Sequence, residues 1–267
     1  MNNTQCIVLI ASLAWSTLGY SQSTTVRIHD GNQVQTTSES SEQVLDLGNV
    51  KGRSKANVSA SNILQAQSGT ANRQALQGGQ ADGASSTDVT IEKSRQVQGG
   101  ARNEQMLRIG QTEGQATSHV AVGTTSQTQA GSQNIQTQNI GNATGNSVTD
   151  VRVGSATQDQ SGTMNSQGMA IGNVSGSARA DVTVGSASQS QSGSQNDQQL
   201  AIGNARGSGS TTVTVGSVVQ VQSGSMNNAS VNIGNNSTGG ANNVSVGSVI
   251  QTQDGIKQRG QVNIGNR

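Results

Sequence analysis

The chain has 267 residues, a formal net charge of +1, no proline and no phenylalanine, and only 30% of its residues are hydrophobic. A charge so close to zero excludes the basic surface that nucleic-acid binding requires, and the single cysteine excludes a disulfide framework within the chain. Abundant Ser, Gln, Asn and Gly are typical of disorder, yet the missing proline is the residue that central β-strands exclude. The composition therefore leaves room for a chain built from strands.

The N-terminus predicts a secretion signal. Residues 6–13 (CIVLIASL) form an apolar run too short to span a bilayer. Small residues follow it, and Gly19-Tyr20-Ser21 suits a signal-peptidase site. We expect a signal peptide over residues 1–21 and a mature chain that begins near Gln22. The first five residues, MNNTQ, lack the usual basic residue, so an apolar N-terminus without a targeting role is the alternative. Cleavage would leave a mature chain without Cys, Trp, Tyr or Phe.

After this segment the chain consists of eight copies of one unit. The marker is the second glutamine of a Gln-x-Gln pair, which returns once after 32 residues and then every 31 residues. These glutamines are Gln35, Gln67, Gln98, Gln129, Gln160, Gln191, Gln222 and Gln253. A fixed period of this size indicates a supersecondary unit that stacks on copies of itself.

Within each copy the spacing is that of strands. Val151 and Val153 alternate with a charged residue, Gln158 and Gln160 flank another, and a further alternating run ends in Ile-Gly. Period two in short runs that Gly and Asn interrupt predicts strand, turn, strand. The Gly-Ser pair that follows the valines shifts the inward positions by one residue, as a bulge or corner does.

Three positions per copy are the candidate structural site. The first is the glutamine at the marker, which we expect to form an inward amide ladder. The others are a glycine two residues later and an asparagine five residues later, which we expect to supply left-handed backbone for a tight reversal. The glycines are Gly69, Gly100, Gly131, Gly162, Gly193 and Gly224, and the asparagines are Asn72, Asn103, Asn134, Asn165, Asn196 and Asn227.

Together these patterns predict an all-β fold. Residues 22–267 should form a single β-solenoid domain of about eight stacked coils with a 31-residue repeat. Equivalent positions would then stack about 4.8 Å apart. After the first copy, Lys, Arg, Asp and Glu avoid the valine and glutamine positions and occur at alternate positions such as Arg152 and Asp159, which predicts an uncharged inner face.

The stretch Gln222–Ile233 (QSGSMNNASVNI) resembles the curlin repeat, Gln-x-Gly-x-x-Asn-x-Ala-x-Val-x-Gln, and the resemblance covers seven of the eight copies. Curlins are the secreted subunits of curli, the functional amyloid fibres of bacterial biofilms. The resemblance implies that the Gln, Gly and Asn positions line the core and shape the turn. Here the period is longer, the last Gln of the motif is Ile, and the Ala position is mostly Gln: Gln74, Gln105, Gln136, Gln167 and Gln198. The Gly-rich targeting segment of curlins is also missing, which leaves the secretion route open.

No set of residues has the pattern of a catalytic or metal site. His29 and His119 fall on outward, non-equivalent positions, and Asp150 and Asp181 share a position on neighbouring copies, as expected for surface residues. No Cys or His cluster has metal-ligand spacing. We expect no enzyme activity, no cofactor, no metal, and neither nucleic acid nor a specific small molecule as a partner.

The expected function is a secreted structural subunit. It would assemble with copies of itself, through coil ends, into extracellular curli-like fibres at the cell surface that serve biofilm matrix, adhesion and cell aggregation. A nucleator subunit and outer-membrane secretion machinery are further expected partners. The chain stops within a repeat, at Ile264-Gly265-Asn266-Arg267, without a distinct cap, which favours the fibre. The alternatives are a monomeric β-solenoid adhesin or stalk, and a nucleator-type minor subunit.

The last copy is more basic than the others, since it carries Lys257, Arg259 and Arg267. We interpret these residues as outward charge that limits premature pairing. A surface-attachment end is the alternative.

Overall fold

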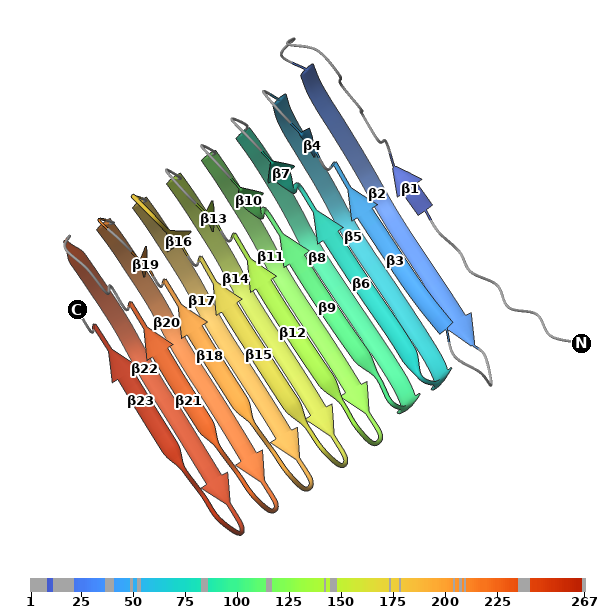
Figure 1. The fold of residues 1–267 in the computed structure, drawn as a ribbon, viewed down its shortest axis with the longest axis vertical. Helices are drawn as coiled ribbons and strands as arrows, with labels where there is room; N and C mark the ends of the chain where they lie inside the picture. The colour runs from blue at the N-terminus through green and yellow to red at the C-terminus, as the bar shows by residue number, and fades with distance from the viewer. Residues whose placement is uncertain are drawn as a thin grey trace, which may run out of the picture.

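The computed structural model describes residues 9–11, 22–36, 41–48, 50–51, 54–82, 86–113, 117–141, 143–144, 148–172, 174–177, 179–203, 205–206, 208, 210–234 and 241–265. Within these ranges the chain contains strands and turns and no helix. The strands stack into a rod of three parallel sheets (Figure 1). The predicted all-β solenoid with a 31-residue repeat is confirmed.

The long sheet has eight strands of 13–17 residues. They are β2 (Gln22–Thr36), β5 (Ser54–Thr70), β8 (Ser86–Ala101), β11 (Thr117–Ala130), β14 (Val148–Ser161), β17 (Arg179–Ser192), β20 (Ser210–Ser223) and β22 (Asn242–Asp254). Every neighbouring pair is parallel and joins equivalent residues of consecutive copies, as in Val151 with Val182.

The middle sheet faces the long sheet across the core and has nine strands. They are β1 (Leu9–Ala11), β3 (Ser41–Leu47), β6 (Asn72–Gly78), β9 (Glu104–Ile109), β12 (Ile135–Ile140), β15 (Ser166–Ile171), β18 (Gln198–Ile202), β21 (Ala229–Ile233) and β23 (Gly260–Ile264). The outermost strand, β1, lies inside the expected signal peptide and pairs with β3. The rest of residues 1–21 lies outside the described residues, and the signal peptide stays a prediction.

The short sheet closes the third side with six two-residue strands. They are β4 (Val50–Lys51), β7 (Ala81–Asp82), β10 (Thr112–Glu113), β13 (Ala143–Thr144), β16 (Val174–Ser175) and β19 (Ala205–Arg206). Complete three-sided turns of the described chain therefore number about six, not the eight expected. The copies that begin with β20 and β22 show two sides each, because residues 235–240 and 266–267 lie outside the described part.

Hydrophobic columns form the core between the two larger sheets. Val151, Val182 and Val213 stack in one column of the long sheet, each at most 1% exposed, and Ile171, Ile202 and Ile233 stack opposite them. Side chains of this size fill a narrow space, which is why the core needs no aromatic residue. The buried polar side chains of the described residues are Gln, Asn, Thr and Ser, and none is charged, so the predicted uncharged inner face is found.

A bulge occurs at the predicted Gly-Ser pair in β14, β17, β20 and β22. In β14 and β17 the register pairs Val153 with Val184 and then Ser155 with Ser186, without pairing the glycines between them. The next inward residue after Val153 is Ala156, three positions on instead of two. The long strand can therefore keep both its valines and its glutamines on the inner face.

The glycine that ends each middle strand makes room for a valine of the next coil. Gly172 has a φ of +70°, and a Cβ there would lie 2.3 Å from Cγ2 of Val182. The same contact recurs between Gly110 and Val120, between Gly141 and Val151, and between Gly203 and Val213. The Ile-Gly ending of each copy is thus a packing requirement as well as a turn.

Gly172→Ala is expected to destabilise the solenoid by roughly 2–4 kcal/mol, because a left-handed backbone and an overfilled contact both penalise the added methyl. Gly168→Ala is the matched control, since that position of β15 has only Gln136 O near a new Cβ, at 4.0 Å. The shift in denaturant midpoint of residues 22–267 measures both changes. Equal shifts would contradict the corner contact.

Candidate assembly interface

The most continuous polar feature of the core is a glutamine ladder along the long sheet. The first glutamine of each Gln-x-Gln pair donates from Nε2 to Oε1 of its equivalent in the preceding coil. The members are Gln33, Gln65, Gln96, Gln127, Gln158, Gln189, Gln220 and Gln251. The distances are 2.7–2.9 Å, except for 3.4 Å at Gln251. From Gln65 onward each Nε2 also donates to a middle-sheet carbonyl, such as Gly168 O at 2.9 Å from Gln158, so the ladder joins coils and sheets.

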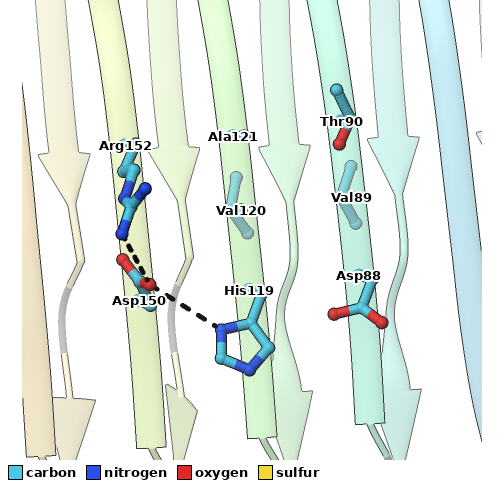
Figure 2. A pocket seen from close by; sticks show the side chains of 8 residues that line it. All are labelled: Asp88, Val89, Thr90, His119, Val120, Ala121, Asp150 and Arg152. Carbon is cyan, nitrogen blue, oxygen red and sulfur yellow. Dashed lines mark ion pairs between the residues drawn. The ribbon is translucent and has the colours of Figure 1, made fainter.

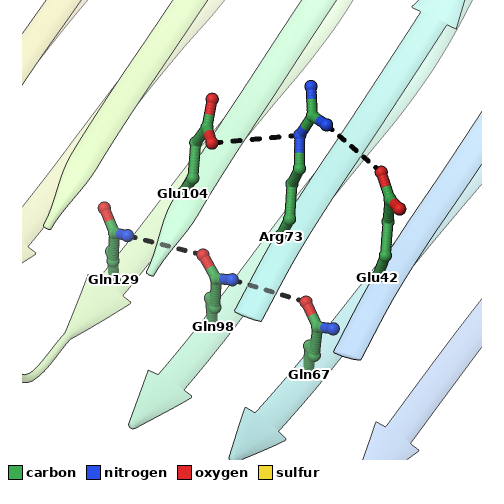
Figure 3. Close-up of polar contacts among 6 residues, drawn as sticks. All are labelled: Glu42, Gln67, Arg73, Gln98, Glu104 and Gln129. Atoms are coloured by element: carbon green, nitrogen blue, oxygen red, sulfur yellow. Dashed lines mark hydrogen bonds and ion pairs between the residues drawn. The ribbon is translucent and has the colours of Figure 1, made fainter. Parts of the chain in front are cut away.

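The marker glutamines form a second column that is interrupted. Gln98 and Gln129 each donate to the preceding marker at 3.4 Å (Figure 3), and Gln253 donates to Gln222 at 3.3 Å. Between them, Gln160 and Gln191 are buried, and their amides have no hydrogen-bond partner in the described part of the chain. The expected amide ladder of the marker glutamines is therefore broken at Gln160 and Gln191.

The backbone carbonyls that flank Gln160 offer it no alternative partner, as is also the case at Gln129. Asp159 O accepts from Gln136 at 2.8 Å, and Ser161 O accepts from Asn134 at 2.7 Å. Side chains of the facing sheet thus already use the backbone acceptors on either side of Gln160. The amide of Gln160 lies in the core and forms no hydrogen bond to either carbonyl.

A third ladder runs along the middle sheet, at the positions where the curlin repeat has alanine. Its members are Gln43, Gln74, Gln105, Gln136, Gln167 and Gln198, joined at 3.0–3.3 Å. The sequence showed these glutamines at a constant distance from the marker, but the curlin comparison marked them as departures. The sequence analysis did not predict this ladder, although the 31-residue recurrence of these glutamines was a signal that could have identified it.

The turn asparagines act mainly as links between coils. Asn165 Nδ2 donates to Ser192 O at 2.8 Å, 27 residues ahead, and Asn196 Nδ2 donates to Ser223 O at 3.0 Å. The predicted left-handed glycines are found, with φ of 107° at Gly162. The second left-handed residue is not the asparagine but the residue before it, such as Met164 with φ of 59°. The asparagine side chain is buried and held by the next coil. In two copies the same Nδ2 also donates within its own turn, from Asn72 to Gly69 O at 2.9 Å and from Asn103 to Gly100 O at 2.7 Å.

The remaining turn asparagines, Asn72, Asn103, Asn134 and Asn227, make the same bond to the next coil at 2.7–3.1 Å.

One end of the rod presents the last described coil to solvent. Among the described strands, β22 pairs only with β20, and β23 pairs only with β21. Val262 and Ile264 of β23 are 42% and 46% exposed, whereas Val231 and Ile233 one coil earlier are fully buried. Edge strands with unpaired backbone groups and apolar side chains are templates for further strands. This end is the candidate site of assembly.

The outer face of the long sheet carries a shallow charged groove (Figure 2). Asp150 Oδ2 lies 4.0 Å from His119 Nδ1 and 3.5 Å from the Arg152 guanidinium, and Asp88 flanks the histidine on the other side. His119 is exposed, and so is His29 on a different column. Asp150 and Asp181 are in register, as predicted.

The described residues include no group of three His, Cys, Asp or Glu side chains that could hold a metal ion. They also contain no helix long and apolar enough to cross a membrane.

On the outer face of the middle sheet, charges of alternating sign form a short ladder (Figure 3). Arg73 lies between two glutamates, 3.3 Å from Glu42 and 3.8 Å from Glu104. All three residues occupy the same position in consecutive coils.

No family model, no curated protein and no solved structure matches the chain.

Proposed function

We propose that this protein is a secreted structural subunit that polymerises end to end into an extracellular fibre. The observation that carries the proposal is the continuity of the inward columns. The valine, isoleucine and glutamine columns that join the last two described coils end at the open face of the last one.

The first coil has side chains that match this surface. In register, Val244 belongs to the column that begins with Val26, and Gln251 belongs to the ladder that begins with Gln33. In the middle sheet, Val262 and Ile264 belong to the columns of Leu45 and Leu47. A second copy could therefore continue these apolar columns and the ladder of Gln33 with residues of the same kind.

Such stacking would bury the apolar side chains that the last coil leaves exposed. It would also give β22 and β23 a parallel partner and so satisfy their outer backbone groups. Because all contacts within the rod are already of this kind, the junction between copies requires no new type of interaction. The outcome is a cross-β fibre whose subunits are themselves stacks of coils.

The resemblance of the repeat to that of curlins supports a bacterial biofilm setting. In that setting the fibre would lie outside the cell, contribute to matrix and adhesion, and start from a nucleator subunit after passage through outer-membrane secretion machinery. The apolar N-terminal run supports secretion.

The test is to purify residues 22–267 and follow assembly from dilute solution. We expect fibres with a meridional reflection near 4.7–4.8 Å, the spacing of strands along a cross-β axis. A chain that stays a soluble, β-rich monomer for days at high concentration would overturn the proposal. It would favour the monomeric adhesin or stalk.

A further inference from the structure

We propose that copies join head to tail in one fixed register, in which Arg259 of one copy pairs with Glu42 of the next and Asn263 lies beside Asp46. This inference rests on the proposed function and specifies the contact. Here the head is the outer edge of β3, and the tail is the outer edge of β23.

The position of Arg259 in the middle sheet leads to this pairing. Gly260 pairs with Ala229, so that Arg259 lies in line with Asn228, one coil earlier. The same column contains Glu42, Arg73, Glu104, Ile135, Ser166, Asp197, Asn228 and Arg259. If the next copy continues the stack, its Glu42 follows Arg259 at one inter-strand spacing, about 4.8 Å.

The charges in this column are complementary across such a junction. Within one copy, Glu42, Arg73 and Glu104 alternate in sign and form ion pairs at 3.3 and 3.8 Å. Arg259 would add a positive charge directly before Glu42, and the alternation would continue between copies. Opposite charges in register across neighbouring strands stabilise the pair, and like charges destabilise it.

The head already pairs with a strand of matching pattern. Leu9, Ile10 and Ala11 of β1 pair in parallel with Leu45, Asp46 and Leu47. Val262, Asn263 and Ile264 of a preceding copy would occupy the same three places. The edge of β3 thus accepts a parallel strand with apolar residues over Leu45 and Leu47.

The residue in register with Asp46 differs between the two strands that can pair with β3: it is Ile10 in β1 and Asn263 in the tail of a preceding copy. Asp46 Oδ1 is buried without a hydrogen-bond partner among the described residues, and burial raises the pKa of this carboxyl. Ile10 has no polar side-chain atom to offer it. Asn263 Nδ2 donates to Asn232 in the preceding coil at 2.8 Å, and its amide also carries an acceptor oxygen, to which a protonated Asp46 can donate. The tail of another copy therefore suits the head better than β1 does.

A shifted register would lose these contacts. A slip of two residues would place Arg259 beside Val44 in place of Glu42 and would remove Ile264 from Leu47. A slip of one residue would turn the apolar side chains of β23 outward.

The test uses two charge-inverted variants of residues 22–267. The first is Arg259→Glu, which puts glutamate on the tail. The second is the triple variant Glu42→Arg, Arg73→Glu, Glu104→Arg, which keeps both internal ion pairs with their signs exchanged and puts arginine at the head. Alone, each variant faces like charges at every junction, and we expect elongation of seeded fibres to slow about tenfold at low salt. In a 1:1 mixture, every junction between one variant and the other brings opposite charges together. We expect this mixture to elongate at nearly the parent rate.

Lys257→Glu is the control for net charge. In the 31-residue repeat of the sequence, the equivalent position of the first copy is a serine and not an acidic residue, so this inversion creates no like-charge pair, and we expect elongation within about twofold of the parent. If the parent forms fibres and each charge-inverted variant alone elongates as fast as the parent, the proposed register is wrong, but the proposed function still holds. A mixture as slow as its components would also overturn the register. Failure of the parent to form fibres would overturn the proposed function itself.

Discussion

Replacing both Val213 and Val215 with aspartate is expected to abolish the folded solenoid around β20. The two side chains are 1% and 2% exposed, and each stacks between valines of the neighbouring coils. Val213 also packs against Gly203 at the corner of the preceding coil. An unpaired carboxylate in such a place costs several kcal/mol, on the order of 3–5 for each site. The loss should appear as missing β-signal in circular dichroism and as absent fibre growth.

The control for this experiment is Thr212→Asp with Thr214→Asp in the same strand. Thr214 is exposed and Thr212 is half-buried, and both point away from the core. The outer columns that contain them already carry Asp181 and Arg152. We expect a folded chain and only modestly slower assembly. Comparable damage from both pairs would show that the assignment of inner and outer faces is wrong.

Gln158→Leu has the second-largest expected effect. Gln158 is fully buried and bonds to Gln127 at 2.8 Å, to Gln189 at 2.9 Å and to Gly168 O at 2.9 Å. Leucine preserves most of the volume but leaves these groups without their partner. Each buried unsatisfied group costs about 1–3 kcal/mol, so we expect a clear fall in the denaturant midpoint and slower fibre growth.

Gln160→Leu is an unusually close control, since it lies two residues further along β14 on the same face. Its amide has no partner among the described residues, and the flanking carbonyls accept from Gln136 and Asn134. Replacing an unsatisfied amide with an apolar group is neutral or stabilising. If Gln160→Leu destabilises the chain as much as Gln158→Leu, the difference between the two glutamine columns does not hold.

The repeat alone was sufficient to predict the stacking. Once residues recur every 31 positions, in-register parallel pairing is the arrangement that lets like side chains meet, and Val151 over Val182 follows directly. The alternation around Arg152 identified the inner face, because a charge cannot be buried there without a partner. The Gly-Ser pair also predicted the bulge, because the spacing between inward-facing residues changes from two to three across it.

The features that could not be predicted from the sequence depend on contacts between residues that lie far apart in the chain. Gln158 and Gln160 look equivalent in the chain, but only Gln158 donates to a carbonyl of the facing sheet, Gly168 O. Asn165 looks like a turn residue, and its role as a link appears only when Ser192 of the next coil is placed beside it. The third side was also hidden, because two-residue strands are too short to show a period.

The glutamine ladder gives the rod a dipole moment along its axis. Its seven bonds all point from Nε2 of one coil to Oε1 of the coil before, and the ladder of the middle sheet points the same way. Aligned amide dipoles add along an axis, as peptide dipoles do in a helix, with the positive end where N–H groups lead. In this protein the positive end is the N-terminal one. Fibres lying side by side would therefore gain electrostatically from opposite orientations, and a bundle of them would contain rods running both ways.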